Sequence, residues 1–177
     1  MATWEIRPEE RSDATHIDAL VAKSFGPGRY AKSAWRLREG VSPQEGLSFV
    51  AIEDNVLRGS VRFWPIAVGP EKALLLGPLA VESEQRGRGI GIALMKRGVE
   101  AARVLGYRVI ILVGDAPYYA RAGFAPLPPG KIKFPGPVDS ARILGLELVT
   151  GALDSLGSEV RRARIDDPVC ADGAAVA

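Results

Sequence analysis

Arg86-Gly87-Arg88-Gly89-Ile90-Gly91 is the stretch of this chain that most strongly constrains its fold. It joins an apolar segment, residues 73–81, to a segment whose apolar residues recur at helical spacing, residues 89–105. Glycines at positions 87, 89 and 91 let the backbone pass close to a ligand. A helix that begins here leaves its first N–H groups without partners, and its dipole favours an anion. We therefore interpret the loop as a phosphate-binding site.

The charges around the loop agree with an anionic ligand. Between residues 85 and 108 a single acid, Glu100, stands among six basic residues, which are Arg86, Arg88, Lys96, Arg97, Arg103 and Arg108. Two other phosphate-binding patterns fit less well. The Gly-Lys-Ser/Thr ending of a Walker A loop is missing from the sequence, and the Rossmann fingerprint would place its third glycine at Ile92 or Leu94. Asp115 does follow the next strand, so a protein that binds NAD stays an alternative.

The remaining elements are predicted from apolar spacing and turn residues. Strands are expected at residues 4–7, 47–53, 56–68, 73–81, 109–113 and 143–148, and helices at 13–25, 30–38, 89–105 and 116–122. Asp13 is expected to cap the first helix, and Ile90, Leu94, Ala101 and Leu105 are expected to line one face of the third. Pro65 requires an edge position or an irregularity, and Gly77-Pro78 predicts a bulge or the close approach of a ligand.

Composition excludes several classes of site. The 177 residues are 47% hydrophobic and 25% charged, which is typical of one globular domain, expected at residues 1–165 with a loose tail at 166–177. Cys170 is the only cysteine and His16 the only histidine, so an internal disulfide is excluded and we expect no metal site. The longest apolar runs are too short to span a membrane, and the N-terminus does not look like a secretory signal, so we expect a cytoplasmic protein.

The glycine-rich loop and the segments around it resemble the GNAT superfamily of N-acetyltransferases. The family signature, Arg/Gln-x-x-Gly-x-Gly/Ala after an apolar strand, is matched in full by residues 86–91. Residues 114–124, which include Tyr119 and end in Gly123-Phe124, resemble the Tyr-x-x-x-Gly-Phe segment of the family. Residues 144–148 look similar to the YhbS-type branch. The resemblance implies a single α/β (α+β) domain, with a mixed, mostly antiparallel sheet flanked by helices and with splayed fourth and fifth strands.

The resemblance also implies a site for acyl-CoA in the cleft between those two strands. Backbone groups of Leu79 and Val81, with Ala80 between them, would pair with the pantetheine arm, and one of these N–H groups would polarise the thioester carbonyl. Tyr119 holds the position of the general acid that protonates the leaving thiolate. The N–H groups expected to hold the pyrophosphate are those of Arg86, Gly87, Arg88, Gly89, Ile90 and Gly91.

The function implied is transfer of an acetyl group from acetyl-CoA to a primary amine by direct attack in a ternary complex. The alternative is a sensor or interaction domain that binds acyl-CoA without turnover. Tyr118 is predicted to be the core member of the tyrosine pair. The strand at 73–81 lacks the glutamate that serves some family members as general base, so the base is left open.

The acceptor half is expected near residues 25–38 and 126–137, whose mixed composition selects neither peptide, polyamine nor small drug. A small-molecule or peptide amine is the expected partner, and neither nucleic acid nor membrane is expected. A homodimer is expected only by analogy with the family.

Overall fold

The computed structural model describes residues 3–164, so the tail predicted at 166–177, with Cys170, lies outside the described residues. The strands are β1 (Glu5–Pro8), β2 (Ser48–Glu53), β3 (Val56–Val68), β4 (Glu71–Val81), β5 (Val109–Val113), β6 (Ala125–Pro126), β7 (Ile143–Glu147) and β8 (Val160–Arg162). The α-helices are α1 (Ala14–Phe25), α2 (Ser33–Arg36), α3 (Ile90–Val104) and α4 (Ala116–Tyr119). Short 3₁₀ turns lie at Arg11–Asp13, Pro27–Ala31, Ser83–Gln85, Ala120–Ala122 and Ser140–Arg142.

The strands form one mixed sheet in the order β1-β2-β3-β4-β5-β7-β6, with β8 paired to β3. The β4–β5 pair is parallel, and the neighbouring pairs along this order are antiparallel. A long β3–β4 hairpin forms the centre, and a turn with Asp54 and Asn55 at positive φ joins β2 to β3. This mixed, mostly antiparallel sheet flanked by helices confirms the predicted fold class.

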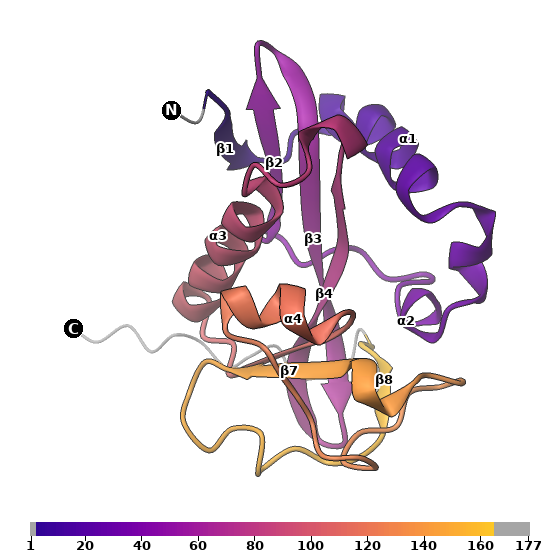
Figure 1. Ribbon diagram of the computed structural model, residues 1–177. Helices are drawn as coiled ribbons and strands as arrows, with labels where there is room; N and C mark the ends of the chain where they lie inside the picture. Colours follow the sequence, from indigo (N-terminus) through magenta and orange to yellow (C-terminus); the bar gives the residue numbers. More distant parts are fainter. Residues whose placement is uncertain (1–2, 165–177) are drawn as a thin grey trace.

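Helices cover both faces of the sheet, as Figure 1 shows with α3 and α1 on opposite sides of β3 and β4. Side chains that alternate along β2 explain this arrangement, because Phe49 and Ala51 face one way while Val50 faces the other. The first two pack in the cluster with Leu94 and Met95 of α3. Val50 packs in the cluster with residues of α1. The two-faced sheet therefore fixes α1 and α3 relative to β4.

A bulge in β4 confirms the expectation drawn from Gly77-Pro78. Phe63 pairs with Leu76 and Val61 pairs with Leu79, so two residues of β4 stand opposite Arg62 alone. Because a bulge bends its strand and increases the local twist, β4 turns away from β5 at this level. The Trp64 side chain supports the bulge by donating from Nε1 to the Gly77 carbonyl at 2.6 Å.

Most predicted elements are present, with four differences. The helix predicted at 30–38 is a 3₁₀ turn followed by the short α2, because Lys32 takes an extended conformation between them. Asp13 does occupy the N-cap position of α1, but its carboxylate receives hydrogen bonds from Arg7 and from the N–H of Glu10 and none from the N–H groups of α1. Leu105 is 45% exposed, since it lies beyond the end of α3. The short strands β6 and β8 were not predicted. Pro65 does lie at an edge, between the end of β2 pairing and the start of β8 pairing.

We expect Gly98→Ala to destabilise the protein although alanine is the better helix former. Helix propensity alone would favour the alanine by about 1 kcal/mol. A methyl group at Gly98, however, would overlap the ring of Phe63, which is fully buried. Overpacking of this kind costs about 1–3 kcal/mol, so the free energy of unfolding measured in urea should fall. Adding Phe63→Leu should recover part of the loss, and a Gly98→Ala variant more stable than the parent would contradict this packing of α3 on β3.

Candidate active site

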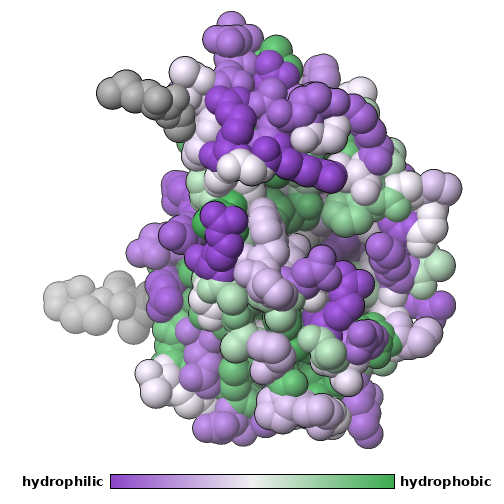
Figure 2. Space-filling view, viewed as in Figure 1, coloured by the Kyte–Doolittle hydropathy of each residue, from purple (hydrophilic) through white to green (hydrophobic). Residues whose placement is uncertain are grey.

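A cavity of about 690 Å³ opens where β4 and β5 diverge. The two strands pair at Leu74 with Ile110 and at Leu75 with Ile111, so in the described part of the chain no strand lies beside β4 beyond Leu75 on the β5 side. Figure 2 shows the surface hollowed here, with hydrophobic and hydrophilic residues both at the rim. Leu76 to Val81 line the cavity, which places the predicted Leu79, Ala80 and Val81 on its wall. The unpaired edge of β4 offers backbone groups to an extended ligand.

The glycine-rich loop forms one end of the cavity. Gly87 and Gly89 both have positive φ, 82° and 85°, which a residue with a side chain adopts only under strain. Gly89 is the N-cap of α3 and has no side chain to accept from the first helical N–H groups, so these donors are left for a ligand. Of the six loop residues predicted to bind the cofactor, Arg86, Gly87, Gly89, Ile90 and Gly91 line the cavity.

The two arginines of the loop differ in their surroundings. Arg86 lines the cavity, and within residues 3–164 its guanidinium has no ion-pair partner, although its backbone N–H is directed to the Ser83 carbonyl at 3.3 Å. The Arg88 side chain is not part of the cavity wall. Its guanidinium donates to both carboxylate oxygens of Glu53 on β2, at 2.8 and 2.9 Å. We infer that Arg86 is the cation available to a ligand and that Arg88 fixes the loop to the sheet.

The Arg88–Glu53 ion pair predicts a pH dependence of stability. Hydrogen bonds from Arg88 and Thr3 lower the pKa of Glu53 from its ordinary value of 4.5 to about 2. A carboxyl whose pKa is depressed by folding stabilises the fold above its unfolded pKa, and that contribution is lost as the pH falls from about 4.5 towards 2. Thermal unfolding of Glu53→Gln should therefore show lower stability at pH 7 and a weaker decline below pH 5.

The matched control for that measurement is Glu159→Gln. Glu159 forms a long, exposed contact with Lys133 at 3.9 Å, and such pairs contribute little to stability. Its acid profile should equal that of the parent protein. If the stability of Glu53→Gln and of the parent fell identically with decreasing pH, the Arg88–Glu53 ion pair would not be what fixes the loop to the sheet.

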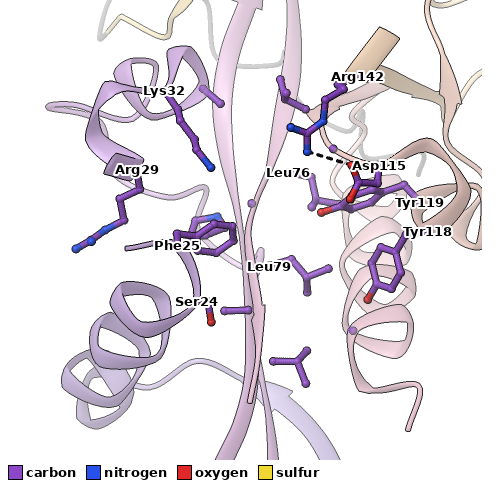
Figure 3. A pocket seen from close by; sticks show the side chains of 18 of the residues that line it. Ser24, Phe25, Arg29, Lys32, Leu76, Leu79, Asp115, Tyr118, Tyr119 and Arg142 are labelled. Carbon is purple, nitrogen blue, oxygen red and sulfur yellow. Dashed lines mark ion pairs between the residues drawn. The ribbon is translucent and has the colours of Figure 1, made fainter. Parts of the chain in front are cut away.

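Tyr118 and Tyr119 form the wall opposite α1, as Figure 3 shows, with Leu76 and Leu79 of β4 between this wall and Phe25. Their rings meet edge to face at 5.2 Å. The Tyr119 ring lies against Gly114, where a Cβ would overlap it, and meets Phe124 edge to face at 6.3 Å. Close packing on both sides therefore fixes Tyr119 in one position. The glycine after β5 and the Gly123-Phe124 turn are the features that place this phenol.

The hydroxyl groups of the two tyrosines lie in different surroundings. Burial, reinforced by the neighbouring Tyr118 and Asp115, raises the pKa of Tyr119 to about 12, and within the described residues its hydroxyl has no hydrogen-bond partner. Tyr118 is 37% exposed, and its hydroxyl lies so close to Gly91 that a Cβ there would collide with it. The prediction that Tyr118 is the core member of the pair is thus wrong, because Tyr119 takes the packed position.

The wall formed by α1, α2 and the turn between them was predicted only as a region. It contributes Phe25, Trp35, Arg29 and Lys32 to the cavity, and Arg38, two residues after α2, adds a third cation. Figure 3 shows Lys32 directed towards β4 and Arg29 directed away from it. The second predicted acceptor segment, residues 126–137, contributes only Pro137 to the lining, and the cavity is also lined by Val138 and Asp139 that follow it. Basic and aromatic residues interleaved over 29–38 are the feature of the sequence that could have identified this wall.

Two other residues singled out in the sequence, Asp115 and His16, lie in different places. Asp115 lines the cavity and pairs with Arg142 at 3.2 Å. His16 is on an exposed position of α1. Among residues 3–164 there is no cluster of three or more side chains suited to hold a metal ion, and no helix in this part of the chain has the length and apolar character to cross a membrane.

Comparison with known proteins points to one family. Residues 9–124 match the model of the acetyltransferase (GNAT) family. The uncharacterized N-acetyltransferase YhbS of Escherichia coli K12 is 36% identical over 121 residues, which cover 67% of this chain and 72% of that protein. The crystal structure of YhbS in complex with CoA superimposes with a TM-score of 0.76 at 30% identity, covering 91% of this chain and 90% of that one. A GNAT acetyltransferase from Brucella melitensis in complex with acetyl-CoA gives a TM-score of 0.66 at 25% identity, covering 90% and 96%.

Proposed function

Because this chain belongs to the GNAT acetyltransferase family, we propose that it transfers the acetyl group of acetyl-CoA to a primary amine by direct attack within a ternary complex. The observation that carries the proposal is the cavity where β4 leaves β5, bounded by the Gly87–Gly91 loop at one end and reached by Tyr119. The similar solved structures that hold CoA and acetyl-CoA support the same ligand.

The lining of the cavity suits the parts of acetyl-CoA in order. The N-terminus of α3 and the Arg86 guanidinium suit the pyrophosphate, because both favour an anion. Leu79 to Val81 on the open edge of β4 suit the amide groups of the pantetheine arm, which pair as a strand would. A backbone N–H in this stretch would stabilise the negative charge that develops on the thioester oxygen.

The reaction needs one proton donor beside the sulfur. The amine nitrogen attacks the thioester carbonyl carbon, the new N–C bond forms, and the C–S bond breaks. Tyr119 would give its proton to the departing thiolate and regain one that the amine releases through water, so the enzyme ends unchanged. A phenol whose pKa is raised to about 12 stays protonated at neutral pH, as this role requires.

The carboxylates on the cavity wall are Asp115, paired with Arg142, and Asp139, which accepts a hydrogen bond from the Ala141 N–H at 3.0 Å. Both are engaged, and neither belongs to β4. Water in the open cavity is therefore the route that we propose for the proton of the amine.

The test incubates the full chain with acetyl-CoA and a panel of amines. Release of the CoA thiol and mass spectrometry of the products measure the reaction. The proposal predicts an acetylated amine and one thiol released per acetyl group. Binding of acetyl-CoA with no product from any amine would favour the sensor alternative. Release of the CoA thiol without an acetylated amine would show hydrolysis of acetyl-CoA and would contradict transfer to an amine.

A further inference from the structure

Arg38 lies two residues after α2 and lines the cavity beside the β4 bulge. A Cβ at Gly77 would stand 3.1 Å from Arg38 Nη2, which places the guanidinium next to the point where β4 turns away from β5. The rings of Trp35 and Trp64 flank it, with centroids 5.2 and 5.9 Å from its central carbon. Arg38 is thus held at the centre of the cavity wall and not at the phosphate end.

This guanidinium is a desolvated cation that pairs with no anion in the described part of the chain. Its Nε is sealed from solvent and has no hydrogen-bond acceptor, and no carboxylate within residues 3–164 forms an ion pair with it. Burial lowers the pKa of Arg38 to about 10, so it still carries its charge at neutral pH. Withdrawing a charge from water is unfavourable unless it is paired, and the two indole rings offset only part of that cost. A ligand anion that reaches the Nη groups on the cavity side would supply the missing charge partner.

The charges of the surrounding wall point the same way. From Ser24 to Arg38 the lining contains Arg29, Lys32 and Arg38 and not one acidic residue. The two carboxylates that line the cavity, Asp115 and Asp139, come from the opposite side and are already engaged. A polycationic acceptor would meet like charge on this wall, whereas an anionic group would meet opposite charge.

We propose that the acceptor is an amine that also carries a carboxylate, with the carboxylate bound to the Arg38 guanidinium and the amino group facing the thioester at the Gly77–Leu79 bulge. The inference rests on the proposed function and adds the class of acceptor to it. One planar guanidinium between two rings matches one carboxylate, which it can bind through two parallel N–H···O bonds. Free amino acids are the simplest compounds that have both groups at the required short separation.

The test compares each standard amino acid as the free acid and as its C-terminal amide, with spermidine as a polycation, at saturating acetyl-CoA. The amide keeps the side chain and removes the carboxylate charge, and because its amine is also less basic, a higher rate for the free acid cannot come from amine basicity. We expect kcat/KM for the preferred free acid to exceed that for its amide about 100-fold, as the loss of a charge-assisted pair predicts. Equal rates for acid and amide, preference for spermidine, or no product from any free acid would overturn the inference.

The variant Arg38→Met provides a second test of the same proposal. It should raise KM for the free acid about 100-fold, leave KM for the amide unchanged, and leave acetyl-CoA binding by calorimetry intact, which excludes a folding defect. Arg36→Met is the matched control, because Arg36 lies in the same segment, is exposed and does not line the cavity. A fall in kcat for acid and amide alike would place Arg38 on the acyl group instead. If the inference fails but other amines are acetylated, the proposed function still stands. If the parent protein does not bind acetyl-CoA, the proposed function itself is contradicted.

Discussion

Tyr119→Phe is expected to lower kcat by about 10²- to 10³-fold with little change in the affinity for acetyl-CoA, because it removes the proton donor and keeps the ring. Gly114 and Phe124 hold that ring in place, so the variant should fold as the parent does. Steady-state kinetics at saturating acetyl-CoA, with thermal unfolding alongside, would measure both effects.

Tyr118→Phe is the matched control for this variant. Both tyrosines line the cavity, but the Tyr118 hydroxyl lies against Gly91, at the end assigned to the pyrophosphate. Its loss should raise KM for acetyl-CoA modestly and leave kcat within a few fold. A large fall in kcat for Tyr118→Phe with none for Tyr119→Phe would exchange the two roles.

The raised pKa of Tyr119 adds a pH prediction to the same experiment. An acid catalyst must be protonated, and a pKa of about 12 keeps Tyr119 protonated through pH 10. The profile of kcat should therefore lack an alkaline decline below about pH 10. A decline centred near pH 8–9 would show that another group supplies the proton.

Gly89→Val is expected to weaken acetyl-CoA binding on the order of 100-fold. Gly89 has φ of 85°, a conformation that a β-branched residue tolerates poorly, so the loop would shift and the first N–H groups of α3 would turn from the ligand. Losing two charge-assisted hydrogen bonds of about 1.5 kcal/mol each corresponds to that factor. Isothermal titration calorimetry would measure the dissociation constant directly.

Gly106→Val controls for backbone strain. Gly106 follows the other end of α3 with φ of 80°, and among residues 3–164 no side chain or distant backbone atom lies within 4 Å of the position that a Cβ would take at either glycine. Both variants should lose similar stability, about 1–2 kcal/mol, from the left-handed conformation. Only Gly89→Val should lose affinity for acetyl-CoA. Equal losses of affinity in the two variants would mean that the effect comes from the stability of α3 and not from the loop.

The central strands and α3 could be predicted because local signals agree with the fold. Strands β3 and β5 begin and end where the apolar patterns and turn residues place them, and Gly77-Pro78 marks the bulge. The glycine loop could be recognised because its positive φ values demand glycine. These features are encoded by neighbours in the sequence, so no knowledge of distant contacts was needed.

The features of the site that could not be predicted depend on contacts between distant segments. Which tyrosine packs inward is decided by Gly114 and Phe124, which meet Tyr119 only after β5 is placed. Arg88 was indistinguishable from Arg86 in the sequence, and its pairing with Glu53 follows from the position of β2. The position of Arg38 on the cavity wall likewise follows from its contacts with Trp64 and Gly77, which are distant in the sequence. Short strands such as β8 carry too few residues to produce a recognisable pattern.

Isothermal titration of the full chain with acetyl-CoA, with NAD as the comparison, is the most direct test of the cavity between β4 and β5 as an acyl-CoA site. The expected result is binding of one acetyl-CoA per chain, weakened by Gly89→Val but not by Gly106→Val, and no response to NAD. Absence of acetyl-CoA binding, or binding of NAD with equal affinity, would contradict the assignment and leave the loop as a structural turn or the site of another anion.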